Sequence, residues 1–174
     1  MSVDYFLKID GIDGESTDSK HASEIQIASF RWTETQSADF SRGATGGGSG
    51  KVQMGTFEFT MRSNKASPKL MLACATGAHI KNAILTCRKA GKDQQEFYKL
   101  TLTNILVASY TTASSLESID ASATITTSVE AAEPTDRVQF AFGKIEVEYR
   151  AQKVDGSLDN PIKTGYDLIQ NTTV

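Results

Sequence analysis

Alternation of apolar and polar residues is the feature of this sequence that most constrains its fold. From residue 3 to residue 9 every second position is apolar, namely Val3, Tyr5, Leu7 and Ile9. A period of two predicts a strand with one buried face. The same period predicts further strands at 25–32, 52–61, 83–87, 98–107 and 166–168, a pair of strands at 138–142 and 145–149, and an edge strand at 123–129. Because no strand–helix–strand rhythm accompanies them, the chain is predicted to be mainly β, as an antiparallel barrel or sandwich.

The apolar parity changes inside the second of these segments. Ile25 and Ile27 alternate, whereas Phe30 and Trp32 fall on the other parity. A bulge near residues 28–29 would return all four side chains to one face of the strand. We interpret the two aromatic residues as core, since this spacing suits core packing better than an exposed ligand platform.

Arg31 and Thr33 lie on the parity opposite Trp32. On an alternating strand these two side chains point to the second face of the sheet. Two interpretations stay open for Arg31. It is either a solvated surface residue or part of a polar face that lines a surface or channel.

One segment breaks the alternation and predicts a short helix that flanks the sheet. Ser67 is a suitable N-cap, Pro68 suits the first helical position, and Gly77 suits the residue that ends a helix. Helical spacing gives this segment one apolar stripe, made of Leu70, Met71 and Cys74. A helix of about two and a half turns does not persist alone, so we expect it to dock on the sheet.

Composition narrows the class of protein. The 174 residues are 39% apolar and 22% charged, which favours one globular domain spanning residues 1–174. A net charge of −3 without a dense Lys/Arg block argues against binding nucleic acid or an anionic membrane surface. No apolar run approaches about 18 residues, so no membrane insertion is expected. The first residues lack a basic region followed by an apolar core, so we expect no signal peptide.

Two long connections interrupt the strands. Residues 38–51 are rich in glycine and predict an extended loop. A phosphate-binding loop would need Gly and Ser or Thr where this chain has Thr45 and Val52, so we do not expect nucleotide binding. Residues 112–135 are rich in Ser, Thr, Ala and Glu and predict a long, variable loop.

The residues that could carry chemistry do not form a recognisable site. The acidic residues between 10 and 18 lack the spacing of a calcium loop. His21 and His79 belong to no nucleophile or metal motif. Cys74 and Cys87 take apolar positions and are interpreted as inert core thiols. We therefore expect no enzymatic activity, no cofactor and no metal.

A resemblance to a known family runs from residue 3 to residue 171. The opening residues 3–11, then 14–16 and His21-Ala22, resemble the start of the Hcp family, the tube-forming haemolysin-coregulated proteins of bacterial type VI secretion systems. The similarity continues through Trp32, 36–37, 46–51, 67–71, 77–79, 88–91, 147–149, 152–153, 155–156, 165–166 and 170–171. Each short motif alone is weak, but the combination in this order is specific.

The resemblance implies a compact β-barrel of two sheets with a flanking helix, assembled as a homohexameric ring. It implies that rings stack into a hollow tube, that a contractile sheath propels the tube out of the cell, and that a VgrG spike protein caps it. Small effector proteins would ride in the lumen. Such a chain would assemble in the bacterial cytoplasm and leave the cell without a signal peptide. The alternative is a monomeric secreted effector or ligand-binding β-barrel.

Two expectations about sites follow from this resemblance together with the strand parity. Arg31 and Thr33 are predicted to face the lumen. The loop 38–51 is predicted to mediate ring stacking through Phe40, Arg42, Gly46, Gly47, Gly48 and Lys51, because a projecting element that orders on contact can join one ring to the next. The loop 112–135 is longer than the corresponding connection of the family pattern.

Overall fold

The computed structural model describes residues 3–36, 52–89, 94–114 and 133–174. All strand pairs in these ranges are antiparallel. The described residues are mainly β, as the alternation predicted, and they contain one short helix. The elements in chain order are β1 (Val3–Ile9), β2 (Ile25–Gln26), β3 (Ser29–Arg31), β4 (Glu34–Thr35), β5 (Gln53–Met54), β6 (Phe57–Arg62), α1 (Ser67–Thr76), β7 (His79–Lys89), β8 (Glu96–Ala113), β9 (Thr135–Tyr149), β10 (Ile162–Asp167) and β11 (Thr172–Thr173).

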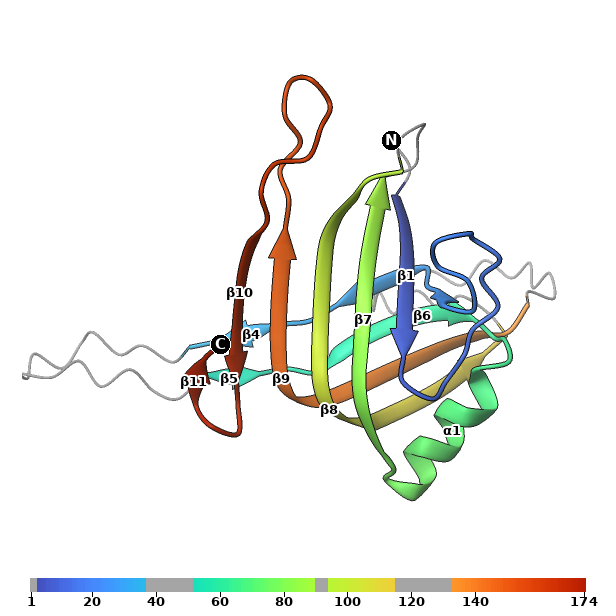
Figure 1. Ribbon diagram of the computed structural model, residues 1–174. Helices are drawn as coiled ribbons and strands as arrows, with labels where there is room; N and C mark the ends of the chain where they lie inside the picture. Colours follow the sequence, from blue (N-terminus) through green and yellow to red (C-terminus); the bar gives the residue numbers. More distant parts are fainter. Residues whose placement is uncertain (1–2, 37–51, 90–93, 115–132) are drawn as a thin grey trace, which may run out of the picture.

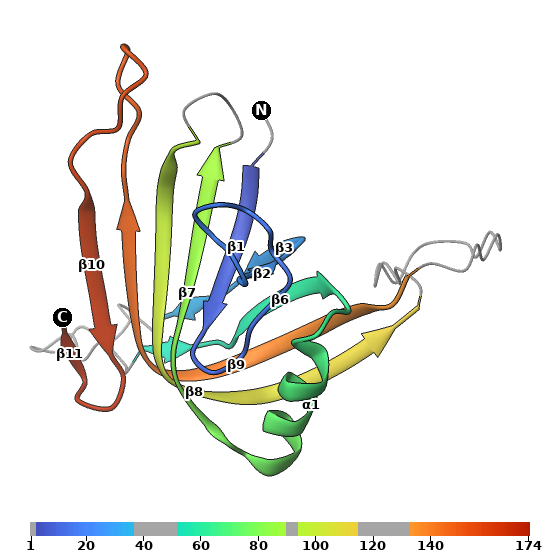
Figure 2. The same cartoon turned by 45° about the vertical axis from the view of Figure 1, so that its right-hand side comes forward.

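Nine strands join into one sheet that bends into two layers (Figures 1 and 2). One layer follows the order β11-β10-β9-β8-β7-β1-β2, while β6 and β3 continue the sheet from the first half of β9. The long strands β8 and β9 belong to both layers and bend where Asn104 lies opposite Gly143. Asn104 has a φ of 57°, and a Cβ on Gly143 would lie 3.2 Å from the Asn104 Nδ2 atom. The pair of strands predicted at 138–142 and 145–149 is therefore one strand, β9, and the change of parity between them is the bend.

The segment from β2 to β3 passes from one layer to the other. The Ile27 N–H donates to the Tyr5 carbonyl of β1 at 3.1 Å, and the next residue, Ala28, donates to the Thr60 carbonyl of β6 at 2.8 Å. This switch between partners is the physical form of the bulge predicted near residues 28–29. Ile25 and Ile27 are buried, and Phe30 and Trp32 pack against the same core.

The core lies between the two layers and under α1. Its fully buried aromatic residues are Phe57 and Phe59 of β6 and Phe140 of β9, whose rings contact one another at centroid distances of 5.2–6.4 Å. A second group from β7 and β8 completes it, including Leu85, Leu100, Leu102 and Ile105. Cys87 is also buried, which raises the pKa of its thiol to about 12 and agrees with an inert core cysteine.

The helix forms where it was predicted, with two differences. Gly77 ends it in the left-handed region at φ 65°, as predicted. The residue before the helix is Ala66 rather than Ser67, because the Ser67 hydroxyl hydrogen-bonds the buried Asp136 of β9 instead of capping the helix. The buried side chains are Leu70 and Ala73, whereas Met71 is 50% exposed. The predicted apolar stripe was therefore wrong at Met71.

The boundaries of the loops between strands also differ from the predicted ones. β8 runs to Ala113 and β9 begins at Thr135, so the loop predicted at 112–135 is shorter than expected at both ends. The last long strand begins at Ile162, ahead of the strand predicted at 166–168. Residues 38–51 and the edge strand predicted at 123–129 lie outside the described residues.

Candidate functional site

The layer formed by β3, β6 and the first half of β9 has one face in the core and one polar face. Cross-strand register places Ser29 opposite Thr60 and Arg31 opposite Glu58, and Glu58 in turn lies opposite Gln139. The Ser29 and Thr60 hydroxyls are 2.7 Å apart. Hydroxyl, amide and charged groups thus follow the strands on the side away from Phe57 and Phe59. Arg31 therefore lies on a polar face of the sheet, opposite the core. Whether this face lines a channel depends on how the protein assembles.

Arg31 and Glu58 form a two-contact ion pair on this face. The Arg31 Nε atom lies 3.0 Å from Glu58 Oε1, and its Nη2 atom donates to Oε2 at 3.3 Å. The Gln139 amide donates to the same Oε2 at 2.8 Å. The carboxylate of Glu58 is largely buried, but the side chain of Arg31 is 74% exposed. The pair therefore presents a guanidinium to whatever faces this layer, held in place by a carboxylate beneath it.

Thr33, the second residue predicted for this surface, is also exposed. It lies just beyond β3, where its carbonyl accepts a hydrogen bond from the Gly55 N–H at 2.8 Å. A Cβ on Gly55 would lie 2.6 Å from the Thr33 hydroxyl oxygen, so a larger residue here would force the Thr33 side chain to shift. The contact lies next to the small sheet of β4 and β5, which leads into the segment 38–51.

All six residues predicted to mediate ring stacking lie outside the described part of the chain: Phe40, Arg42, Gly46, Gly47, Gly48 and Lys51. The pairing of Glu34 with Met54 and of Thr35 with Gln53 brings the two ends of the segment together.

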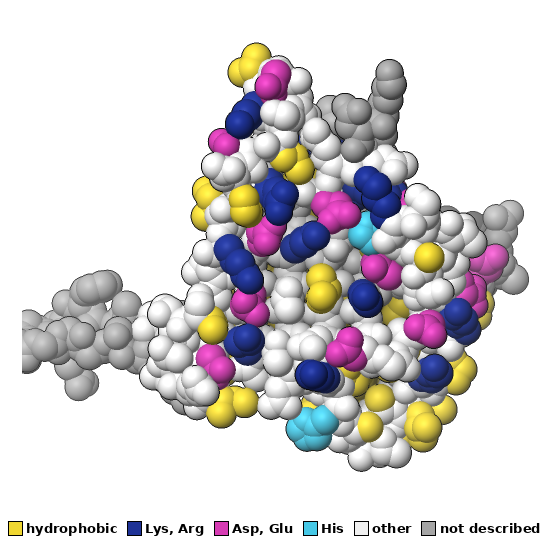
Figure 3. All heavy atoms as spheres, viewed as in Figure 1, with side chains coloured by type: hydrophobic (Ala, Val, Ile, Leu, Met, Phe, Trp, Pro, Cys, Tyr) yellow, Lys and Arg dark blue, Asp and Glu magenta, His cyan; other side chains and the backbone are white. Residues whose placement is uncertain are grey.

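The outer face of the other layer carries alternating charges, visible in Figure 3 as interspersed Lys/Arg and Asp/Glu side chains. Lys163 and Lys144 contact the carboxylate of Glu146 at 3.1 and 3.2 Å. These two ammonium groups, Lys163 first, hold the pKa of Glu146 below its ordinary value. Arg150 and Glu148 form a further pair on the same face at 3.0 Å. The charges largely compensate one another, so this face has no single sign.

Beside these charges, the outer face near β1 is covered by the segment between β1 and β2. Phe6 lies on the polar parity of β1 but is buried. The ring of His21 stacks on it at a centroid distance of 4.3 Å and an interplanar angle of 7°. The guanidinium of Arg88 lies 4.7 Å from the same ring. We call Phe6, His21, Arg88 and Asp18 the clamp, because they fasten this segment to the sheet.

Arg88 is the centre of the clamp. Its Nη1 and Nη2 atoms donate to the two carboxylate oxygens of Asp18 at 3.0 and 2.8 Å, and Nη2 also reaches Asp4 at 3.3 Å. The Arg88 side chain is only 4% exposed. The bond from Arg88, followed by the backbone N–H of Lys20, holds the pKa of Asp18 far below its ordinary value.

His21 completes the clamp and is itself buried. Its Nδ1 atom lies 2.9 Å from a carboxylate oxygen of Glu24, and its Nε2 atom lies 3.4 Å from Glu96. Sequence reasoning placed His21 in a polar loop and assigned no structural role to Arg88. Phe6 could have indicated this arrangement in the sequence. It is a large apolar residue on the polar parity of a strand, so another part of the chain has to bury it.

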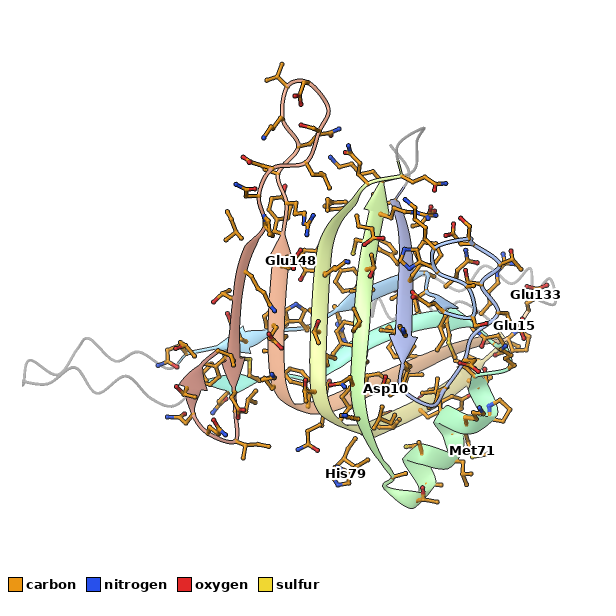
Figure 4. All side chains as sticks on the ribbon, in the orientation of Figure 1. Asp10, Glu15, Met71, His79, Glu133 and Glu148 are labelled. Carbon is orange, nitrogen blue, oxygen red and sulfur yellow. The ribbon has the colours of Figure 1, made fainter. Side chains whose placement is uncertain are left out.

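A groove of about 670 Å³ lies where β6 ends, beside the segment that carries Glu15. Figure 4 shows Glu15 and Glu133 on this side of the molecule. Arg62 pairs with Glu133 at 3.1 Å across the groove, and both side chains are well exposed. Its lining mixes polar residues such as Ser63 and Asn64 with the apolar residues Ile27, Ala28 and Pro134.

The described ranges contain no group of three or more His, Cys, Asp or Glu side chains placed to hold a metal ion. In those same ranges no helix has the length and apolarity needed to cross a bilayer. Two organised polar features of the described residues are the open face around Arg31 and the clamp around Arg88.

Comparison with known proteins decides the family. The family model described as "Type VI secretion system effector, Hcp" matches residues 6–149. The chain belongs to the Hcp family. It is 38% identical to protein hcp1 of Pseudomonas aeruginosa over 173 residues, which cover 98% of each chain. The chain is therefore a type VI secretion system protein, and the resemblance seen in the sequence is confirmed.

Solved structures agree with the fold of this Hcp-family chain. The crystal structure of Hcp1 from Salmonella typhimurium matches with a TM-score of 0.73 and 34% identity, covering 99% of this chain and 100% of the other. A structure described as a type six secretion system protein matches with a TM-score of 0.85 and 26% identity, covering 99% and 100%. Both matches run over nearly the whole chain, so the two layers and the helix form one family fold.

Proposed function

We propose that this protein is a structural tube subunit of a type VI secretion system. Six copies form a ring, and rings stack into a hollow tube that is assembled in the bacterial cytoplasm and then exported. A VgrG-like spike, sheath proteins and small effector proteins are its partners, and it has no enzymatic activity of its own. Family membership supports the secretion system, and the open polar face around Arg31 is the observation that carries the subunit role.

The proposed subunit is a closed barrel. The hydrogen bonds of Ile27 and Ala28 support closure, because consecutive residues of one segment pair first with β1 and then with β6. The remaining sheet connects β1 back to β6 through β7, β8 and β9. A barrel removes the free strand edges that would otherwise invite irregular association.

We assign the polar face to the lumen, with Arg31 and Thr33 exposed to cargo. A sheet face that is polar, hydrogen-bonded and, among the described residues, left uncovered suits a water-filled channel. Hydroxyl and amide groups such as Ser29, Thr60 and Gln139 can hold water or a polar protein surface without requiring its burial. The segment 38–51 is assigned to ring stacking, and the pairing of β4 with β5 holds together the described residues on either side of it.

Native mass spectrometry tests the ring. The expected mass is about six times the 18.8 kDa of the chain. A single species at the mass of one chain would contradict the ring and favour a monomeric effector or ligand-binding barrel. Deleting Gly46–Gly48 should leave the ring mass unchanged and reduce tube formation in electron micrographs, and unaltered tubes would exclude the stacking assignment.

A swap of charges tests the lumen. Arg31→Glu alone would place a carboxylate beside Glu58, so the matched control is Arg31→Glu combined with Glu58→Arg, which restores the pair in reverse. Both variants should form rings and change cargo retention in a pull-down with co-expressed effector. Monomers from both variants would show that Arg31 lies at a subunit contact rather than in the lumen.

A further inference from the structure

The strands that form the open polar face direct charged side chains away from the core, and most of these are arginines. The residues are Arg31 of β3, Glu58 and Arg62 of β6, and Arg137 of β9. Each arginine is next in sequence to a residue that packs in the core, so strand alternation turns it to the opposite face. We call Arg31, Arg62 and Arg137 the arginine cluster.

Strand pairing sets the spacing of the cluster, since β3, β6 and β9 lie side by side (Figure 2). Arg137 lies opposite Thr60, which is two residues from Arg62 along β6, and Arg31 lies opposite Glu58. With strands about 4.8 Å apart and a rise of about 3.4 Å per residue, the Cα atom of Arg137 lies about 8 Å from that of Arg62 and about 12 Å from that of Arg31. The screening length of moderate salt is about 8–10 Å, so one charged ligand can interact with all three guanidinium groups.

The cluster carries more positive charge than its carboxylate partners compensate. Arg31 pairs with Glu58, whose side chain is only 11% exposed. Arg62 pairs with Glu133 at 3.1 Å, but both side chains of this pair are largely in water. Arg137 is half-buried and makes no ion pair with any described residue. Among the described residues this face is therefore positive, although the chain as a whole has a net charge of −3.

The side chains around the cluster indicate which kind of anion fits it. The polar neighbours on the same face are hydroxyl and amide groups, namely Ser29, Thr60, Thr135 and Gln139. No aromatic side chain is among the outward-facing residues of β3, β6 and the described first half of β9, so these strands offer no ring on which a nucleotide base could stack. Guanidinium groups bind carboxylates through two parallel hydrogen bonds, and hydroxyl and amide groups can hydrogen-bond the rest of a polar protein surface.

We propose that the arginine cluster binds an acidic surface on a partner protein. Carboxylates of the partner pair with Arg137, which has no other ionic partner among the described residues, and with the exposed parts of Arg31 and Arg62. This inference rests on the proposed contact between the open face and cargo, and it adds that the cargo presents Asp and Glu side chains there. Because these contacts are ionic and partly exposed, the binding weakens as the salt concentration rises.

Binding of a model acidic peptide tests the cluster. The probe is fluorescently labelled poly-L-glutamate, and fluorescence anisotropy measures its Kd for the full chain. Arg137→Gln should weaken binding about fivefold, as expected for the loss of one exposed ion pair. Arg150→Gln is the matched control, because it removes one arginine from the other layer, where Arg150 pairs with Glu148. Circular dichroism verifies folding, and Arg62→Gln replaces Arg137→Gln if that variant does not fold.

The outcomes separate this inference from the proposed function. Wild-type protein that does not bind poly-L-glutamate, or an equal loss of binding in Arg137→Gln and Arg150→Gln, would overturn the acidic partner while leaving the proposed function standing. A single-stranded oligonucleotide of equal charge that binds as tightly as poly-L-glutamate would show that the cluster recognises any polyanion, and would overturn the assignment to a protein surface. Native mass spectrometry of the same samples reports the ring, and wild-type protein that is monomeric would overturn the proposed function itself.

Discussion

Each layer of the sheet has a face that points away from the core, and the chain treats these two faces differently. On one, Arg31 pairs with Glu58 and stays 74% exposed. On the other, Arg88 pairs with Asp18 and is only 4% exposed, because the segment after β1 folds over it. Both are arginine–carboxylate pairs with contacts near 3 Å. The two pairs differ in their access to water. The exposed pair is available to a binding partner, whereas the buried pair holds a segment of the chain on the sheet.

The free energy of an ion pair depends on that access. An exposed pair is screened by water and contributes about 0–1 kcal/mol to stability. Removing one partner of a buried pair leaves the other charge without compensation and costs about 3–5 kcal/mol. Substitutions in the clamp should therefore lower the free energy of unfolding, whereas substitutions on the open face should change it little.

The largest expected effect comes from Arg88→Ala. The variant removes the buried guanidinium that holds Asp18 and covers Phe6, so the free energy of unfolding should fall by about 3 kcal/mol, at the low end for a buried pair because Asp18 still reaches water. Urea denaturation followed by the fluorescence of Trp32 measures this. Protein concentration is kept constant, since assembly makes the midpoint depend on it.

Arg88→Lys is the control for this variant. It keeps a positive charge but cannot make the two-contact bond to Asp18, so it should restore only part of the lost stability. If Arg88→Ala unfolded at the wild-type urea concentration, the clamp would not fasten the segment.

A smaller effect is expected from acid. The pKa of Asp18 in the folded protein lies far below its ordinary value of 3.8, first because Arg88 donates to it. A carboxyl group whose folded pKa is lowered adds stability above its unfolded pKa, and this stability is lost as the pH falls below about 4. Asp18→Asn cannot titrate. The difference in melting temperature between wild type and Asp18→Asn should therefore shrink from pH 6 to pH 3, and a constant difference would contradict the assignment.

Local patterns predicted much of the fold. β1 forms at the predicted residues, Gly77 ends the helix, and the change of partner at Ile27 and Ala28 lies where the parity shift indicated. These features depend on residues close in sequence. Parity did not show that β9 continues through a bend at Gly143, because the bend is set by pairing between distant segments.

The clamp escaped prediction for a similar reason. Arg88 lies 70 residues from Asp18, and no local pattern connects them. Met71 was wrongly expected in the core, because helical spacing defines a stripe but not which side of it meets the sheet. The open face was predictable at Arg31, since alternation alone sets the direction of that side chain.

The next smaller loss of stability is expected from His21→Ala. The variant loses the stacked contact with Phe6 and the hydrogen bond to Glu24, together about 2 kcal/mol. His21→Phe keeps the stacking and loses only the hydrogen bond, so it should cost about half as much. Thermal unfolding of the three proteins side by side measures both. Equal losses in the two variants would show that the ring contact with Phe6 contributes nothing.

The smallest change in stability is expected from Arg31→Gln. The side chain of Arg31 is mostly in water, and Glu58 keeps its hydrogen bond from Gln139 at 2.8 Å after the substitution. The free energy of unfolding should therefore fall by less than about 1 kcal/mol, in the same urea experiment as Arg88→Ala. A loss as large as that of Arg88→Ala would mean that Glu58 depends on Arg31 as a buried partner. The polar face would then stabilise the fold as the clamp does. The proposal that this face contacts cargo would lose its physical basis.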